Sequence, residues 1–167
     1  MMTLPKMTEI PAIGMTVEVF DTWVHEGATK IVGYFKQEHI PTYFFFARGK
    51  VTVAQFVGNF ERPEERDEFR RWAKEFAAKH RLLAVAFVAE LYIKTIKDDD
   101  DLLPYLSGDL RARDAIDRKE MLRVLVQTPQ QIVSTMYEIR RNAGNIMSLS
   151  KLVPEVLGES PFMEFFT

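Results

Sequence analysis

The chain has 167 residues, of which 47% are hydrophobic and 28% charged, and its formal net charge is −2 at pH 7. A chain of this length forms one domain with a sizeable core. Its charge disfavours binding to nucleic acid or to an anionic membrane, which normally requires a basic face. The absence of cysteine excludes disulfides, thiol nucleophiles, iron–sulfur clusters and cysteine zinc sites.

Residues 1–15 contain two prolines and a glycine, and they predict an irregular or loosely extended lead-in. This segment lacks the charged and apolar regions of a signal peptide. No apolar run in the sequence approaches the roughly 20 residues that span a bilayer. We therefore expect a soluble, cytoplasmic protein with no membrane association.

A helical pattern begins at Val17 and must end before Pro41, because proline disfavours helical geometry at the residue before it. Apolar residues recur at the spacing of one helix face: Phe20, Trp23, Val24, Gly27, Ile31, Tyr34 and Phe35.

Two strands are expected next, at 42–47 and 50–57, joined through Arg48-Gly49. Glycine adopts the positive φ that a tight hairpin turn requires. The first strand is aromatic on both faces, a pattern typical of a strand covered by helices on both sides or by another subunit.

The segment 61–81 predicts the second long helix. Pro63 suits its first turn, and the early glutamates and late basic residues complement the helix dipole. Its apolar stripe consists of Phe69, Trp72, Ala73, Phe76 and Ala77.

The second half of the chain predicts further strands. Residues 82–96 alternate as a long central strand, although their alanines leave a helix open in the first half. Residues 119–128 predict another strand. Residues 130–141 fit either a helix capped at Thr128-Pro129 or a strand after a turn, and their β-branched residues favour the strand.

The tail contains a short helical pattern at 148–156 and an apolar segment at 158–167. The chain therefore predicts a single α+β domain over residues 1–167, with a mainly antiparallel sheet packed against two long amphipathic helices in the order α-β-β-α-β-β-β.

An acidic loop is expected at 97–118, opening on four consecutive aspartates. Asp98 and Asp100 are weak candidates for metal ligands. Counted from Asp98, the sixth position of a calcium-binding loop is Leu103 where glycine is needed, so that pattern fails. Its composition favours a solvated loop without a metal.

Glu90 interrupts an otherwise apolar strand. A partly buried carboxylate requires a cation or hydrogen-bond donors, and the basic residues available for an ion pair are Arg118, Arg123, Arg140 and Arg141. A structural ion pair is the first interpretation. A catalytic carboxylate in a cleft is the alternative.

The histidines His25, His39 and His80 show no metal-ligand spacing, and neither a serine nucleophile elbow nor a nucleotide-binding glycine loop occurs. We expect no cofactor. The sequence favours a non-catalytic binding or assembly module. The alternatives are a small hydrolase or metal-dependent enzyme that uses Glu90 with a loop aspartate, and nucleic-acid binding through the arginines of 111–123 and 140–141.

The excess of aromatic residues predicts a homodimer. The apolar tail folds onto its own domain or a symmetric neighbour, or alternatively binds another protein. The candidate interface residues are Phe44, Phe46, Phe162, Phe165 and Phe166.

Overall fold

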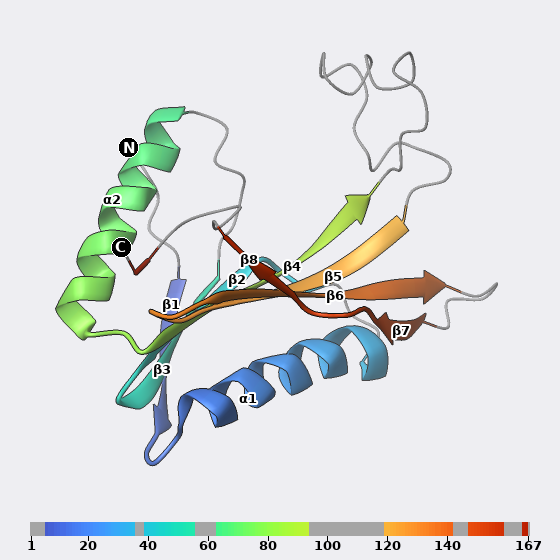
Figure 1. Cartoon of the computed structure of the whole chain (residues 1–167), viewed down its shortest axis with the longest axis horizontal. Coiled ribbons are helices and arrows are strands. Elements are labelled where there is room, and N and C mark those ends of the chain that lie inside the picture. Colours follow the sequence, from blue (N-terminus) through green and yellow to red (C-terminus); the bar gives the residue numbers. More distant parts are fainter. Residues whose placement is uncertain are drawn as a thin grey trace.

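The computed structural model describes residues 6–35, 39–55, 63–93, 119–141, 147–158 and 165–166. In this part of the chain an eight-stranded antiparallel sheet separates two helices that cover opposite faces (Figure 1). One is α1 (Val17–Thr29), which continues into the π-helical turn η1 (Lys30–Tyr34), and the other is α2 (Pro63–His80). The predicted fold class, a single α+β domain, is confirmed.

The sheet has the strand order β1-β3-β2-β4-β5-β6-β7, and β8 also pairs with β6. Each pairing is antiparallel. The strands are β1 (Lys6–Ala12), β2 (Thr42–Ala47), β3 (Gly49–Gln55), β4 (Ala84–Ile93), β5 (Lys119–Gln127), β6 (Ile132–Arg141), β7 (Met147–Lys151) and β8 (Glu155–Leu157).

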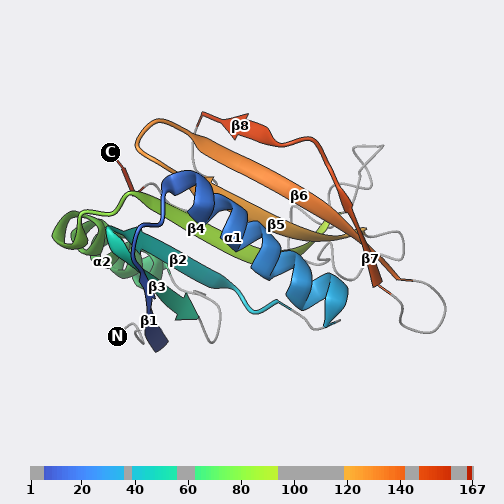
Figure 2. The same cartoon turned by 90° about the horizontal axis from the view of Figure 1, so that it is seen from below.

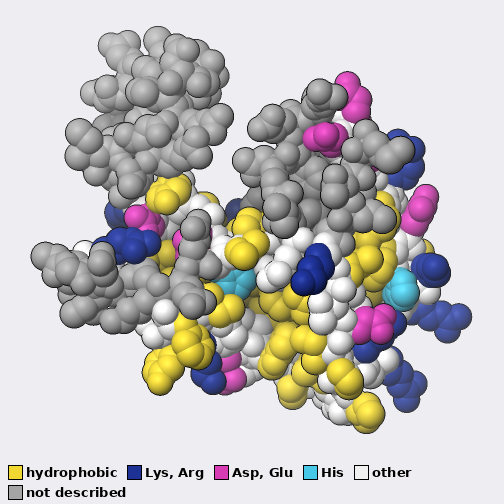
Figure 3. Space-filling view, turned by 180° about the vertical axis from the view of Figure 1, so that it is seen from behind, with side chains coloured by type: hydrophobic (Ala, Val, Ile, Leu, Met, Phe, Trp, Pro, Cys, Tyr) yellow, Lys and Arg dark blue, Asp and Glu magenta, His cyan; other side chains and the backbone are white. Residues whose placement is uncertain are grey.

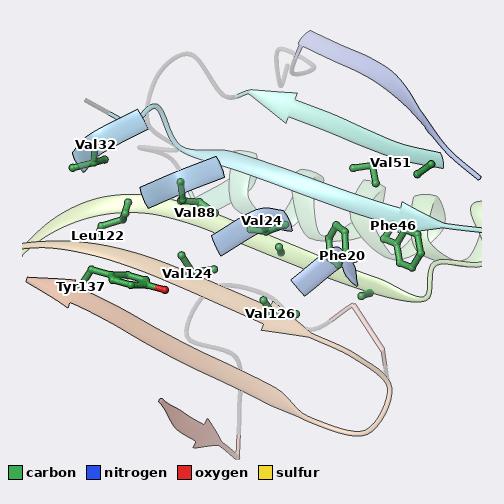
Figure 4. Close-up of a cluster of buried hydrophobic side chains, with 14 of the residues drawn as sticks. Phe20, Val24, Val32, Phe46, Val51, Val88, Leu122, Val124, Val126 and Tyr137 are labelled. Atoms are coloured by element: carbon green, nitrogen blue, oxygen red, sulfur yellow. The ribbon is translucent and has the colours of Figure 1, made fainter. Parts of the chain in front are cut away.

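Strand β2 is covered by helices on both sides, as one of the two interpretations of its aromatic sequence predicted. Phe46 packs against Phe20 of α1 with ring centroids 5.0 Å apart. On the opposite face, Phe45 packs against Phe76 of α2 at 4.9 Å. The sheet therefore has two cores, and Figure 4 shows the α1 side, where Tyr137 of β6 joins the buried side chains.

Helix α1 begins where predicted, after Thr16, whose hydroxyl accepts a hydrogen bond from the Val19 N–H at 3.2 Å. Its buried stripe differs from the prediction in the last turns. Tyr34 is 77% exposed, because η1 closes an i→i+5 hydrogen bond from the Phe35 N–H to the Lys30 carbonyl and so shifts the phase of the helix. The buried residues follow an i, i+4 spacing: Phe20, Val24, Ala28 and Val32.

Helix α2 and the hairpin are confirmed. In α2 the predicted stripe faces the sheet, with Phe69, Ala73 and Ala77 buried. In the hairpin, Ala47 pairs with Lys50 across the turn, and Gly49 has a φ of +84°. Only glycine adopts this φ without a steric penalty.

The central strand is confirmed as β4, which pairs with both β2 and β5. The segment 130–141 forms a strand, as favoured, from Ile132 to Arg141, and it pairs with β5 from Ile132 to Ile139. Thr128 closes the β5–β6 loop: its backbone N–H donates to the Gln131 carbonyl at 2.9 Å, and its hydroxyl accepts from the N–H groups of Gln130 and Gln131.

The two chain ends differ from the predictions. The lead-in, expected to be irregular or loosely extended, contains the ordered strand β1, which pairs with β3 from Lys6 to Ala12. Pro11 is compatible with this strand because β1 lies at the sheet edge. The helix expected at 148–156 is replaced by β7 and β8, which satisfy the second edge of β6. The acidic loop, with Asp98 and Asp100, lies outside the described residues.

Candidate functional sites on either side of helix α1

Helix α1 crosses its face of the sheet (Figure 2). A hollow lies on each side of the helix. We name the hollow toward β1, β3 and β2 the Trp23 cavity. Its lining residues are Ile10, Trp23, Val24, Gly27, Ala28, Ile31, His39, Ile40, Thr42, Phe44, Val53 and Gln55. We name the hollow toward β5, β6 and β7 the His25 cleft. Its lining residues are Val17, Glu18, Asp21, Thr22, His25, Glu26, Val126, Thr128, Gln131, Val133, Thr135, Tyr137, Lys151 and Pro154.

The Trp23 cavity has a volume of about 410 Å³ and mostly apolar walls. Trp23 and Phe44 form an aromatic wall, with ring centroids 5.6 Å apart and planes at 89°. Ile10 and Ile40, which also line the cavity, are exposed to solvent. Seen from behind, hydrophobic side chains gather over the lower half of the molecule (Figure 3).

His39 is the one histidine of the Trp23 cavity, and it is 5% exposed. Its ring Nδ1 lies 2.9 Å from the Ile40 carbonyl. Because a carbonyl only accepts hydrogen bonds, Nδ1 carries the proton and Nε2 is the acceptor. Burial lowers the pKa of His39, and the hydrogen bond to Ile40 opposes that shift. The ring is therefore neutral at pH 7.

The backbone around His39 is held by two further hydrogen bonds. The His39 N–H donates to Oε1 of Glu90 at 3.0 Å, and the Thr42 hydroxyl donates to the Ile40 carbonyl at 2.6 Å. The Ile40 carbonyl thus accepts from both the His39 ring and Thr42. These contacts fix the segment that closes one side of the cavity.

The His25 cleft has a volume of about 440 Å³ and contains a chain of hydrogen-bonding side chains. Nδ1 of His25 lies 2.7 Å from the Tyr137 hydroxyl, and Nε2 lies 3.5 Å from Oδ1 of Asp21. Since a carboxylate only accepts hydrogen bonds, the His25 Nε2 that faces Asp21 carries the proton. Nδ1 is then unprotonated and accepts a hydrogen bond from the Tyr137 hydroxyl.

Burial sets the protonation states of His25 and Tyr137. It lowers the pKa of His25, although the charge of Asp21 acts in the opposite direction and Lys151 lowers the pKa further. Burial and then the charge of Asp21 raise the pKa of Tyr137. A neutral imidazole and a neutral phenol therefore coexist at pH 7.

Sequence reasoning did not identify the His25 cleft. The i, i+4 spacing of Asp21 and His25 places the two residues on one face of a helix. This spacing was the sequence feature that could have indicated the cleft. The Tyr137 contact joins residues separated by 112 positions, so sequence spacing could not reveal it.

Glu90 lies on β4, half-buried, on the face of the sheet that α1 covers. It contributes to the raised pKa of Arg141, after the hydrogen bond that Arg141 makes to Glu120 at 2.8 Å. The Glu90 carboxylate thus accepts a hydrogen bond from the backbone beside the Trp23 cavity, and its charge acts on an arginine at a strand end.

The arginines proposed as partners of Glu90 are placed differently. Arg140 lies 3.6 Å from Glu138, on the opposite face of β6 from Arg141. Arg123 donates to the Ser134 hydroxyl at 2.9 Å. Arg118 lies outside the described residues.

The predicted interface residues lie within the chain's own packing where they are described. Phe46 is fully buried and Phe165 is 5% exposed. Phe44 and Phe166 are partly buried against the α1-side and α2-side cores, respectively. Phe162 lies outside the described residues. The two helices cover opposite faces of β2, which removes the reason to expect a partner subunit there.

Within the described ranges, no three histidine, aspartate or glutamate side chains gather as a metal site would require. The same part of the chain contains no helix with the length and hydrophobicity of a membrane span. Comparisons with protein-family models, with curated proteins and with solved structures found no match.

Proposed function

We propose that this protein is a non-catalytic binding protein and that the Trp23 cavity holds a small apolar molecule. The observation that carries the proposal is the cavity itself, a hollow of about 410 Å³ lined by α1, three strands and the segment before β2. Small-molecule sites in proteins have volumes of about 300–1,000 Å³, apolar walls and a few placed polar groups. The Trp23 cavity has each of these properties.

The polar groups of the cavity define the ligand further. His39 is neutral, and its Nε2 accepts hydrogen bonds while Nδ1 is engaged with the Ile40 carbonyl. A ligand with one N–H or O–H donor therefore complements this site. Because His39 is buried, such a bond would be protected from competing water and would orient the ligand.

The same contacts favour binding over catalysis. A nucleophile requires a base within hydrogen-bonding reach. The Thr42 hydroxyl donates its proton to the Ile40 carbonyl, and the His39 ring donates to that same oxygen. The Thr42 hydroxyl and the His39 ring thus bond to the same backbone carbonyl and not to each other. These bonds hold the cavity wall in place.

N-phenyl-1-naphthylamine is a suitable probe, because it is apolar, carries one N–H donor and fluoresces more strongly in apolar surroundings. The chain has two tryptophans, so a Trp72→Phe variant leaves Trp23 as the only one. We expect saturable binding at one molecule per chain, with energy transfer from Trp23 to the probe. Unsaturable binding, or binding without transfer from Trp23, would contradict the proposal.

Gly27 provides the matched control. It lies between Trp23 and Ile31 on the stripe of α1 that lines the cavity, and a Cβ added there meets nothing within 4 Å. Gly27→Leu should therefore fill the cavity and abolish probe binding, whereas Gly27→Ala should retain most of it. Equal binding by both variants would place the probe elsewhere.

Self-association remains a prediction, and the binding proposal does not depend on it. The described interface candidates are buried or partly buried within one chain. A dimer interface would therefore exclude the buried Phe46 and Phe165. Sedimentation equilibrium of the full chain at micromolar concentration tests this prediction, and a monomer of 19.4 kDa would contradict it.

A further inference from the structure

The His25 cleft has an acidic wall. Glu18, Asp21 and Glu26 lie along one side of α1, at spacings that place them above the cleft. Among the described lining residues, Lys151 is the one basic side chain apart from His25. His25 is neutral at pH 7 because burial lowers its pKa. The walls thus carry more negative than positive charge and complement a cation.

The strand side of the cleft contains a hydroxyl that can bind a ligand. Thr135 lines the cleft, although the residue is only 3% exposed. Within the part of the chain that the structure describes, its hydroxyl has no hydrogen-bond partner. Since no described side-chain oxygen is both fully buried and unsatisfied, this hydroxyl reaches the surface of the cleft. A ligand hydroxyl in the cleft can form a hydrogen bond with it.

Apolar side chains also line the cleft beside this hydroxyl. Val126 and Val133 flank Thr135 on β5 and β6, and the cleft has room for a short alkyl chain in its volume of about 440 Å³. The cleft therefore combines carboxylates on α1 with apolar side chains and a hydroxyl on the sheet that α1 covers.

We propose that the His25 cleft binds a small alkylamine that carries a hydroxyl at its other end. The ammonium group lies against the carboxylates of α1, the alkyl chain lies on the two valines, and the hydroxyl bonds to Thr135. This site is separate from the Trp23 cavity, so its occupancy does not depend on the binding function proposed above.

The test uses 5-amino-1-pentanol and two compounds that each lack one of its features, 1,5-pentanediol and pentylamine. Isothermal titration calorimetry at pH 7.5 and 150 mM salt gives the affinity of the full chain for each. We expect 5-amino-1-pentanol to bind at least tenfold more tightly than the diol, because the diol lacks the positive charge. Equal affinities, or no binding of 5-amino-1-pentanol, would overturn the proposal.

Conservative variants separate the two ends of the ligand. Glu18→Gln combined with Glu26→Gln should weaken the binding of 5-amino-1-pentanol at least fivefold. Glu75→Gln, at an exposed position of α2, should leave the affinity unchanged. Thr135→Val keeps the side-chain volume and should reduce the affinity for 5-amino-1-pentanol to that for pentylamine. Unchanged affinity in either cleft variant would overturn the proposal. Circular dichroism confirms that each variant is folded, and Gly27→Leu should leave amine binding intact.

Discussion

The ring of His25 and the hydroxyl of Tyr137 meet at 2.7 Å and tie helix α1 to strand β6 across the core. The two rings lie edge to face, with centroids 5.9 Å apart. Tyr137 is buried, so this hydrogen bond is one of the polar contacts that position α1 on the sheet. It also forms the boundary of the His25 cleft, since both residues line it.

Tyr137→Phe removes the hydroxyl and leaves Nδ1 of His25 without its donor. We expect a loss of about 1–3 kcal/mol in the free energy of unfolding, the cost of an unsatisfied buried polar group. The pKa of His25 should also rise, because the lost bond stabilised the neutral ring. Urea denaturation and an NMR titration of His25 measure the two effects. Tyr34→Phe is the control, because Tyr34 is exposed, and a similar loss there would contradict the assignment.

The protein should lose stability as the pH falls from 7 toward 5. Burial lowers the pKa values of His25 and His39 in the folded state, below the ordinary value of 6.5 that applies when the chain unfolds. Protons therefore bind the unfolded chain more tightly. The stabilisation is complete above the unfolded pKa and declines below it, down to the folded pKa values.

Urea midpoints at half-unit intervals between pH 7.5 and 5.5 give the slope. The variant with both His25→Gln and His39→Gln should show a flatter slope, whatever its absolute stability. Asp21 and Lys151 influence His25 in opposite directions, so Lys151→Gln should raise the pKa of His25. An unchanged slope in the double variant would show that other groups cause the pH dependence.

The elements that sequence predicted well are those whose pattern is local. Helix α2 carries its stripe, its early glutamates and its late basic residues within one segment. Strand β2 is aromatic on both faces, and the turn after it requires Gly49. In each case the residues that determine the element lie close together in the sequence.

The elements that sequence missed depend on distant partners. Residues 147–151 and 155–157 are extended because β6 offers them a free edge, and residues 6–12 are extended because β3 does. The same distinction holds for the sites. Asp21 and His25 share a helix face, but the neighbours that make two hollows beside α1 come from six strands, and their side chains converge only after folding.

Phe165 belongs to the core of the domain. It lies 5.8 Å from the ring centroids of both Tyr43 and Phe45. Phe165→Ala should cost about 3–5 kcal/mol in the free energy of unfolding, the usual effect of deleting a buried phenylalanine. Urea denaturation measures the loss, and sedimentation equilibrium should show the same association state as the parent chain. A stable variant with altered association would instead place Phe165 in an interface.

Two glycines should respond to alanine in opposite directions. Gly27 lies in the last turns of α1 with open space around its Cα, and alanine should stabilise the helix by about 0.5–1 kcal/mol. Gly49 also has open space, but its φ is +84°, so alanine should destabilise the hairpin turn by about 1 kcal/mol or more. The surroundings are matched and only the backbone conformation differs. Thermal or urea unfolding of the two variants gives the signs, and equal signs would show that φ does not decide the response.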